Sequence, residues 1–142
     1  AAVQGCDVER PVPTLIIHGT ADPCWAMEGG TSACLQDDGM NKVGVQETVD
    51  GWVERNGCAG EPVIEDLPDA DPEDGTTTTR RTHGACTDGG DVVVLLSEGG
   101  GHTWPGGWQY LGEEQVGPMV RDYQANEEMW AFFAAHPRPD VP

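Results

Sequence analysis

The chain has 142 residues, enough for one domain with a modest hydrophobic core. It carries 25 acidic side chains against 7 Lys and Arg, a formal net charge of −18 at pH 7, so phosphate backbones and anionic membrane surfaces would repel it. It contains no apolar run of about 18 residues that would span a bilayer. It shows no signal peptide and does not begin with Met, so we expect a segment processed or cut from a longer polypeptide.

Two short apolar runs predict buried strands. The first is "PTLIIHG", residues 13–19, which ends at Gly19, and the second is "DVVVLLSEGG", residues 91–100. Neither run alternates apolar and polar residues, which is typical of a central strand covered on both faces. We therefore predict a sheet with these two strands at its centre.

A helix is predicted between the two strands, over residues 41–57. Its apolar residues recur at helical spacing: Val45, Val49, Trp52 and Val53. Asn41 is the expected N-cap, and Gly57 is the expected C-terminal stop. The order strand, helix, strand predicts an α/β fold with a parallel crossover.

The rest of the chain predicts an acidic loop, a polar strand and a terminal helix. Residues 65–75 form the proline-punctuated acidic loop, and "TTTTRRTH", residues 76–83, an exposed extra strand. Residues 122–136 form the helix, ended by the prolines at 137 and 139. We expect one apolar stripe of this helix to pack on the sheet: Tyr123, Met129, Trp130 and Phe133. With no internal repeat or linker, residues 1–142 are expected to form a single segment.

The cysteines suggest export. Five cysteines are many for this length, and no CxxC pair occurs, which argues against a zinc ribbon or a thioredoxin-type site. Cysteines scattered in polar loops favour disulfides and a secreted protein. The expected pairs are Cys24 with Cys34 and Cys58 with Cys86, which leaves Cys6 without an assigned partner.

Two polar, glycine-containing loops follow the predicted strands. "HGTADPCW" contains Asp22, and "EGGGHTWPGG" contains His102. Sites in open α/β sheets assemble at the carboxyl edge of the strands, where both loops would lie. A carboxylate beside an imidazole fixes its tautomer and stabilises the imidazolium that forms when the ring takes a proton from a nucleophile. Asp22 and His102 are therefore the candidate catalytic residues.

The spaced motifs "PTLIIHGTADP", "VDGWVERNGC", "DGT" and "GGGHTWPGG" resemble the C-terminal half of exported α/β-hydrolase esterases. This group includes polyhydroxybutyrate depolymerases, feruloyl esterases and related acetyl-xylan esterases, and the resemblance covers residues 12–136. It implies that Asp22 is the triad acid and His102 the triad base, and that Cys58 and Cys86 are bridged. It also implies that the loop containing Trp104 faces the acyl or aromatic part of a substrate. Trp25 is a second candidate for substrate binding.

The nucleophile of such an enzyme is missing from this segment. The triad order in α/β-hydrolases is Ser, Asp, His, with the serine on a G-x-S-x-G elbow. The chain has two serines, Ser32 and Ser97, and both follow Asp22 outside any such elbow. We therefore expect the serine and the oxyanion hole to come from other polypeptide. The strand at 14–17 also needs a neighbour on its far side, either a separate N-terminal half or a second copy in a dimer.

Other readings remain open. Four histidines, at positions 18, 83, 102 and 136, show no HxH or HExxH spacing for zinc, and no cofactor is expected. Calcium on the acidic loop would use Asp66, Asp69, Asp71 and Asp74, but a solvated acidic face is the more common outcome. His18 stands four residues before Asp22, and a hydrogen-bonded structural role is favoured for it over a side chain that points into the same cleft.

The main alternative function is a carbohydrate- or polyester-binding module derived from a truncated hydrolase. In that case three tryptophans would offer stacking surfaces: Trp25, Trp104 and Trp108. We expect instead a secreted serine esterase segment that contributes the acid and base of a triad.

Overall fold

The computed structural model describes residues 10–31 and 40–137. Its strands are β1 (Thr14–Gly19), β2 (Val63–Asp66), β3 (Thr77–His83) and β4 (Val92–Glu98). Its helices are α1 (Val45–Arg55), the short α2 (Glu113–Val116) and α3 (Ala125–Ala135), with a 3₁₀ turn at Thr87–Gly89. No helix in the described part of the chain is long and apolar enough to cross a membrane.

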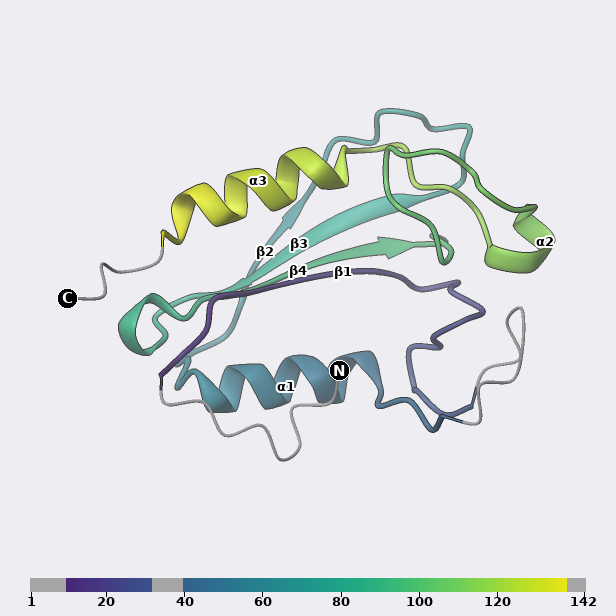
Figure 1. The fold of residues 1–142 in the computed structure, drawn as a ribbon. Coiled ribbons are helices and arrows are strands. Elements are labelled where there is room, and N and C mark those ends of the chain that lie inside the picture. The colour runs from purple at the N-terminus through teal and green to yellow at the C-terminus, as the bar shows by residue number, and fades with distance from the viewer. Residues whose placement is uncertain (1–9, 32–39, 138–142) are drawn as a thin grey trace.

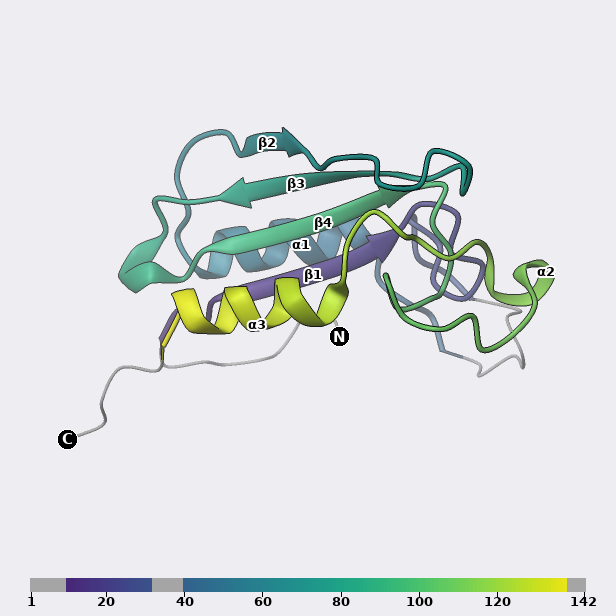
Figure 2. The same ribbon diagram turned by 90° about the horizontal axis from the view of Figure 1, so that it is seen from above.

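The four strands of the described residues form one mixed sheet in the order β1-β4-β3-β2 (Figure 2). β1 and β4 run parallel, with Thr14 opposite Val92 and Gly19 opposite Ser97. β3 runs antiparallel to both β4 and β2. The predicted α/β class and the parallel crossover from β1 through α1 to β4 are therefore confirmed.

β4 is the central strand, as its apolar sequence predicts. Val92, Val94 and Leu95 are buried, because β4 is paired on both sides and covered on both faces. α1 lies against one face of the sheet and α3 against the other (Figure 1). Leu95 belongs to a cluster with Val120, Tyr123 and Ala125 on the α3 side.

β1 is less buried than its sequence predicts. In the described residues it pairs with β4 alone and so forms the edge of the sheet. Positions 14–18 are half-buried, and only Gly19 is buried. Within the described residues β1 is therefore an edge strand rather than a central one, and its second edge is the side on which a neighbour from other polypeptide is expected.

Helix α1 begins later than predicted. Its N-cap is Gly44, without a side-chain cap, so the expected N-cap Asn41 is wrong. The backbone before the helix is already engaged: Lys42 pairs with Gly30 in a two-way bridge, and the Val45 amide donates to the Met27 carbonyl. These bonds keep residues 41–44 out of the helix. At the other end, Gly57 follows the C-cap with φ +62°, a conformation that favours glycine.

The segment 65–83 contains more sheet than predicted. Glu65 and Asp66, expected in the acidic loop, belong to β2. β3, expected as an exposed strand, is paired on both sides, and Thr76 and Thr78 at its start are buried. Their hydroxyls make this possible because each has a partner: Thr76 donates to Asp74, and Thr78 bonds Ser97 and Asp122.

Helix α3 turns a different face to the sheet than predicted. Phe132 is buried and Tyr123 is buried just before the helix, but Trp130 is 74% and Phe133 55% exposed. Ala125 and Phe132 are seven positions apart and so share one helix face, which is the face that packs inward. The expected packing of Trp130 and Phe133 on the sheet is therefore wrong for this chain.

Candidate active site

The loops after β1 and β4 are joined by hydrogen bonds where the two parallel strands end. The Thr20 amide donates to the Ser97 carbonyl and the Ala21 amide to the Gly100 carbonyl, both over 2.9 Å. The Gly99 amide donates to the Thr20 hydroxyl over 2.9 Å. Because the strands are parallel and in register, the two loops leave the sheet side by side.

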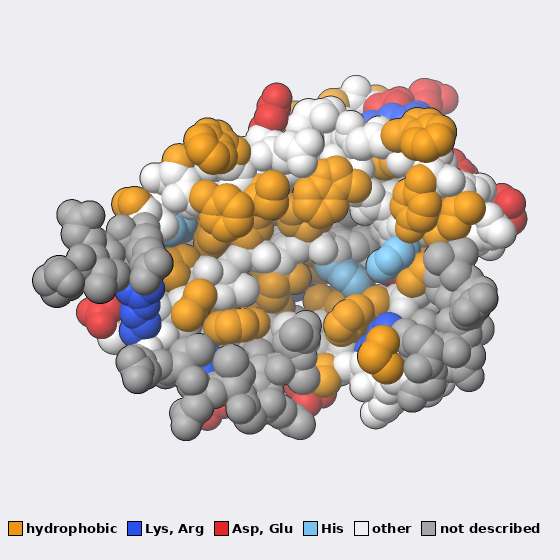
Figure 3. Space-filling model, viewed as in Figure 1, with side chains coloured by type: hydrophobic (Ala, Val, Ile, Leu, Met, Phe, Trp, Pro, Cys, Tyr) orange, Lys and Arg blue, Asp and Glu red, His pale blue; other side chains and the backbone are white. Residues whose placement is uncertain are grey.

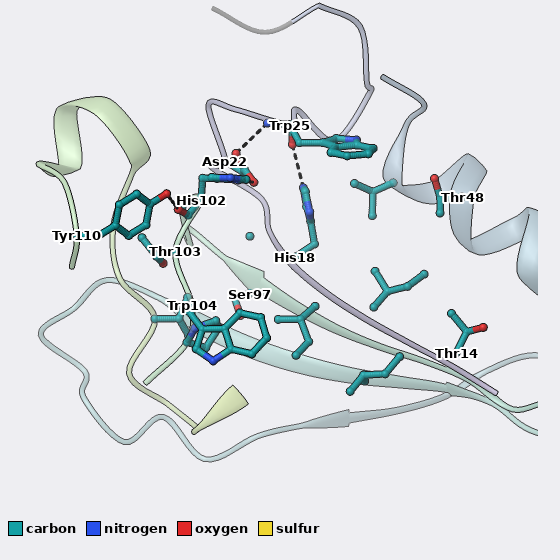
Figure 4. A pocket seen from close by; sticks show the side chains of 18 of the residues that line it. Thr14, His18, Asp22, Trp25, Thr48, Ser97, His102, Thr103, Trp104 and Tyr110 are labelled. Carbon is teal, nitrogen blue, oxygen red and sulfur yellow. Dashed lines mark hydrogen bonds and ion pairs between the residues drawn. The ribbon is translucent and has the colours of Figure 1, made fainter. Parts of the chain in front are cut away.

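This arrangement brings Asp22 and His102 together. Nδ1 of His102 lies 2.8 Å from Oδ2 of Asp22, across 80 positions of sequence. The Asp22 side chain is 6% exposed and the His102 side chain 47%. Figure 4 shows the two side chains beside each other in the pocket. Since a carboxylate oxygen accepts, Nδ1 carries the proton of the neutral ring and Nε2 keeps a lone pair. The imidazole is thus oriented as an acceptor at Nε2, and the ring reaches solvent.

The second oxygen of Asp22 organises its own loop. Oδ1 accepts the backbone amides of Cys24, over 2.7 Å, and of Trp25, over 2.9 Å. This is an Asx-type turn, a common role for an aspartate before a proline. Asp22 therefore combines a local turn role with the contact to His102, one oxygen for each.

Glycines allow the two loops to approach this closely. A Cβ on Gly19 would lie 2.2 Å from the Gly100 carbonyl oxygen. A Cβ on Gly101, next to His102, would lie 2.3 Å from the Val116 carbonyl oxygen. Both distances are far below a van der Waals contact, so only glycine fits.

We expect Gly101→Ala to destabilise the protein by about 3 kcal/mol, because backbone rather than a flexible side chain must give way. Urea unfolding of the complete polypeptide measures this loss. Gly84→Ala is the matched control, because a Cβ there meets nothing within 4 Å. Equal midpoints for the two variants would show that the loop yields easily.

The backbone of His102 is held on both sides. Its amide donates to the Val116 carbonyl, and the Gly101 amide donates to the Pro118 carbonyl. The Tyr110 hydroxyl donates to the His102 carbonyl over 2.8 Å. Sequence reasoning missed Tyr110; its place eight positions after His102 in the same glycine- and tryptophan-rich loop was the available signal.

His18 lies near the pair, lines the same cavity and is half-buried. Its Nε2 is 3.0 Å from the Trp25 carbonyl oxygen. Burial lowers the pKa of His18, and the nearby charge of Asp22 partly opposes this shift. The indole Nε1 of Trp25 donates to the Val43 carbonyl over 2.8 Å.

A cavity of about 660 Å³ opens beside His102, between β1, α1 and the two loops. Its lining is largely apolar and includes Leu15, Ile17 and Trp52, together with Trp25 and Trp104, the two predicted substrate-binding residues. Figure 3 shows the hollow, with hydrophobic side chains around pale-blue histidines. Trp104 is 46% exposed, and its indole donates to Asn126. Trp108, 82% exposed, is not among the lining residues.

Metal-binding groups in the described residues already have other bonds. Asp22, Cys24 and His102 place ligand atoms within 4.8 Å of one another. Cys24, however, is disulfide-bonded, so it offers no thiolate, and both oxygens of Asp22 are in use. In the acidic loop, Asp74 accepts from Thr76 and from the Arg121 amide, and Asp71 pairs with Arg121. Asp74 and Asp71 therefore hold the acidic loop together through hydrogen bonds and an ion pair.

The described serine, Ser97, is not placed as a nucleophile. It is 1% exposed on β4, and its hydroxyl bonds Thr78 on the neighbouring strand over 2.9 Å. Beside this pair, burial raises the pKa of Tyr123 to about 12. Ser32 lies outside the described residues, as do Cys6 and Cys34, the expected partner of Cys24. The predicted disulfide between Cys58 and Cys86 is confirmed.

Comparison with known proteins finds esterases. The chain is 36% identical over 103 residues to "Putative esterase NocK" of Nocardia uniformis subsp. tsuyamanensis, and 30% identical over 97 residues to "Feruloyl esterase B" of Piromyces equi. Each match covers 68% of this chain but only 30% of NocK and 16% of the feruloyl esterase. No family model and no solved structure matches. Over about two thirds of its length the chain is therefore similar to part of two longer esterases, a relation that indicates an ester-hydrolase lineage.

Proposed function

We propose that this chain supplies the acid and the base of a Ser-His-Asp triad in a carboxylic-ester hydrolase. The observation that carries the proposal is the Asp22–His102 hydrogen bond of 2.8 Å, at the carboxyl edge of two parallel strands and beside an apolar cavity. Similarity to two esterases supports the same class of reaction. The serine and the oxyanion hole come from polypeptide outside these 142 residues.

Nε2 of His102 takes the proton of the serine hydroxyl as its oxygen attacks the ester carbonyl. Asp22 stabilises the imidazolium through Nδ1. As the tetrahedral intermediate collapses, His102 gives the proton to the leaving alcohol, and an acyl-enzyme remains. Water then attacks the acyl carbonyl while Nε2 of His102 takes its proton. As this second intermediate collapses, His102 returns the proton to the serine oxygen and the carboxylic acid is released. No step needs a metal or a cofactor.

In the described part of the chain β1 has no strand partner on its second edge, which supports an origin of the missing serine and oxyanion hole in polypeptide that extends the sheet there. Both esterase relatives are much longer than the matched region. A second copy of this chain would bring only Ser32 and Ser97, and neither stands in a G-x-S-x-G elbow. An N-terminal portion that continues the sheet beyond β1 is therefore favoured over a dimer.

The cavity favours esters with an apolar or aromatic part. Trp25 and Trp104 line it together with aliphatic side chains of β1, so a hydrophobic acyl group finds apolar contacts beside His102. The feruloyl esterase among the relatives acts, by its name, on an aromatic ester. Disulfides at Cys24 and at Cys58–Cys86 support a secreted enzyme.

A fluorophosphonate probe tests the proposal on the complete polypeptide. The probe labels an activated serine, so mass spectrometry of digested protein is expected to find it on a peptide outside residues 1–142, with loss of ester hydrolysis. Label on Ser97, or hydrolysis that survives full labelling, would contradict the proposal. Absence of both label and hydrolysis, with binding to insoluble polyester or polysaccharide, would favour the binding module, for which exposed Trp108 is a candidate contact.

A further inference from the structure

Trp25 joins the Asp22 loop to two other parts of the molecule, the segment before α1 and the end of β1. Its backbone amide donates to Oδ1 of Asp22, its indole donates to the Val43 carbonyl, and its own carbonyl is bonded by His18. A carbonyl oxygen only accepts, so Nε2 of His18 must carry a proton. The bond from His18 at the end of β1 thus closes a ring of contacts around the turn that presents Asp22.

We propose that His18 is a positioning residue for this triad: its Nε2–H holds the Trp25 carbonyl and thereby fixes the turn that aims Asp22 at His102. This inference rests on the proposed function, because it concerns how the acid is held. His18 acts through Trp25 and Asp22 and transfers no proton itself. Figure 4 shows the imidazole directed at the Trp25 carbonyl, between the strand and the loop.

The surroundings of His18 suit a neutral ring. The charged or titratable groups that act on it are Asp22 and His102, and Tyr110 is the one further titratable side chain in the described cavity lining. Helix α1 contributes Val45, Thr48 and Trp52 to that lining, none of which titrates. Because burial lowers its pKa, the ring is neutral at pH 7 and keeps the Nε2–H tautomer that the Trp25 carbonyl requires.

The test compares His18→Leu with His18→Gln in the complete enzyme, using a soluble activated ester. Gln carries its amide nitrogen as many bonds from Cβ as Nε2 of His, so it can donate to the Trp25 carbonyl, whereas Leu cannot. We expect His18→Leu to lower kcat about tenfold with little change in KM. A misplaced Asp22 carboxylate stabilises the transition state less but leaves substrate binding unchanged. His18→Gln is expected to keep kcat within about twofold of wild type, because the donor to the Trp25 carbonyl is retained and only the ring is lost.

A double-variant cycle separates positioning from an independent role. If His18 acts through Asp22, His18→Leu will cost nothing further in an Asp22→Asn background. An equal loss in both backgrounds, or an unchanged kcat in His18→Leu, would overturn the proposal. Loss in His18→Gln equal to that in His18→Leu would also overturn it, because it would show a need for the imidazole itself.

Two further measurements keep the result interpretable. If His18→Leu fails to fold, His18→Asn replaces it: its amide stops one bond short of the carbonyl and is expected to lower kcat in the same direction. Failure of the proposed function is separately visible, because an inactive wild-type enzyme or an active His102→Ala variant would reveal it. With those two controls as expected, unchanged His18 variants would reject the positioning role alone.

Discussion

His102→Ala is expected to reduce kcat for ester hydrolysis by a factor on the order of 10⁶ in the complete enzyme, with a small change in KM. Alanine removes the imidazole that Asp22 orients toward the cavity, so the serine hydroxyl would have no base. Residual turnover would come from the oxyanion hole and substrate binding alone. Stopped-time assays with a p-nitrophenyl ester measure the loss over the required range.

His83→Ala is the matched control for that experiment. His83 is the last residue of β3 and pairs with Val92 at the start of β4. It therefore lies at the end of the strands opposite the two loops. Its replacement should leave kcat unchanged. Near-native turnover in His102→Ala would remove the basis for the triad.

Asp22→Asn is expected to lower kcat by about 10⁴-fold while the fold is preserved. The amide oxygen can still accept the Cys24 and Trp25 amides, as Oδ1 does in Asp22. The amide nitrogen then faces Nδ1 of His102 and can only donate, so the ring proton moves to Nε2. The imidazole would then present N–H to the serine and could not take its proton.

Asp50→Asn serves as the control for charge and amide chemistry. Asp50 is exposed on α1, where it accepts from Gln46 four positions earlier. We expect Asp50→Asn to leave kcat unchanged and to change the free energy of unfolding by less than about 0.5 kcal/mol. Urea unfolding should also give unchanged midpoints for both variants. If Asp22→Asn kept kcat within tenfold of wild type, the acid would be needed for the turn and not for the tautomer.

Local sequence pattern was sufficient to predict the central strand, the crossover helix and the two loops that meet at the site. The apolar run within residues 91–100 predicted β4, and helical spacing predicted α1. Parallel pairing of the two strands then sufficed to bring Asp22 and His102 to one edge, because the carboxyl ends of parallel strands coincide. The pattern also identified the loops that need glycine for close approach.

The start of α1 and the inward face of α3 could not be predicted from the sequence, because contacts between distant residues set them. The start of α1 depends on the bridge between Gly30 and Lys42, and periodicity gives no sign of that bridge. The inward face of α3 depends on how the helix crosses the sheet, so Trp130 was assigned to the wrong side. His18 bonds the Trp25 carbonyl and Tyr110 the His102 carbonyl, and position along the chain does not by itself identify those partner atoms.

The second edge of β1 has a practical consequence when residues 1–142 are produced on their own. Within residues 10–31 and 40–137, the strand Thr14–Gly19 has β4 as its partner on one flank only, and an unpaired flank of this kind is a template for further strand addition. Two such molecules meeting there would join their sheets in a concentration-dependent manner. Light scattering of a dilution series would register that association, and co-expression with the upstream portion should suppress it.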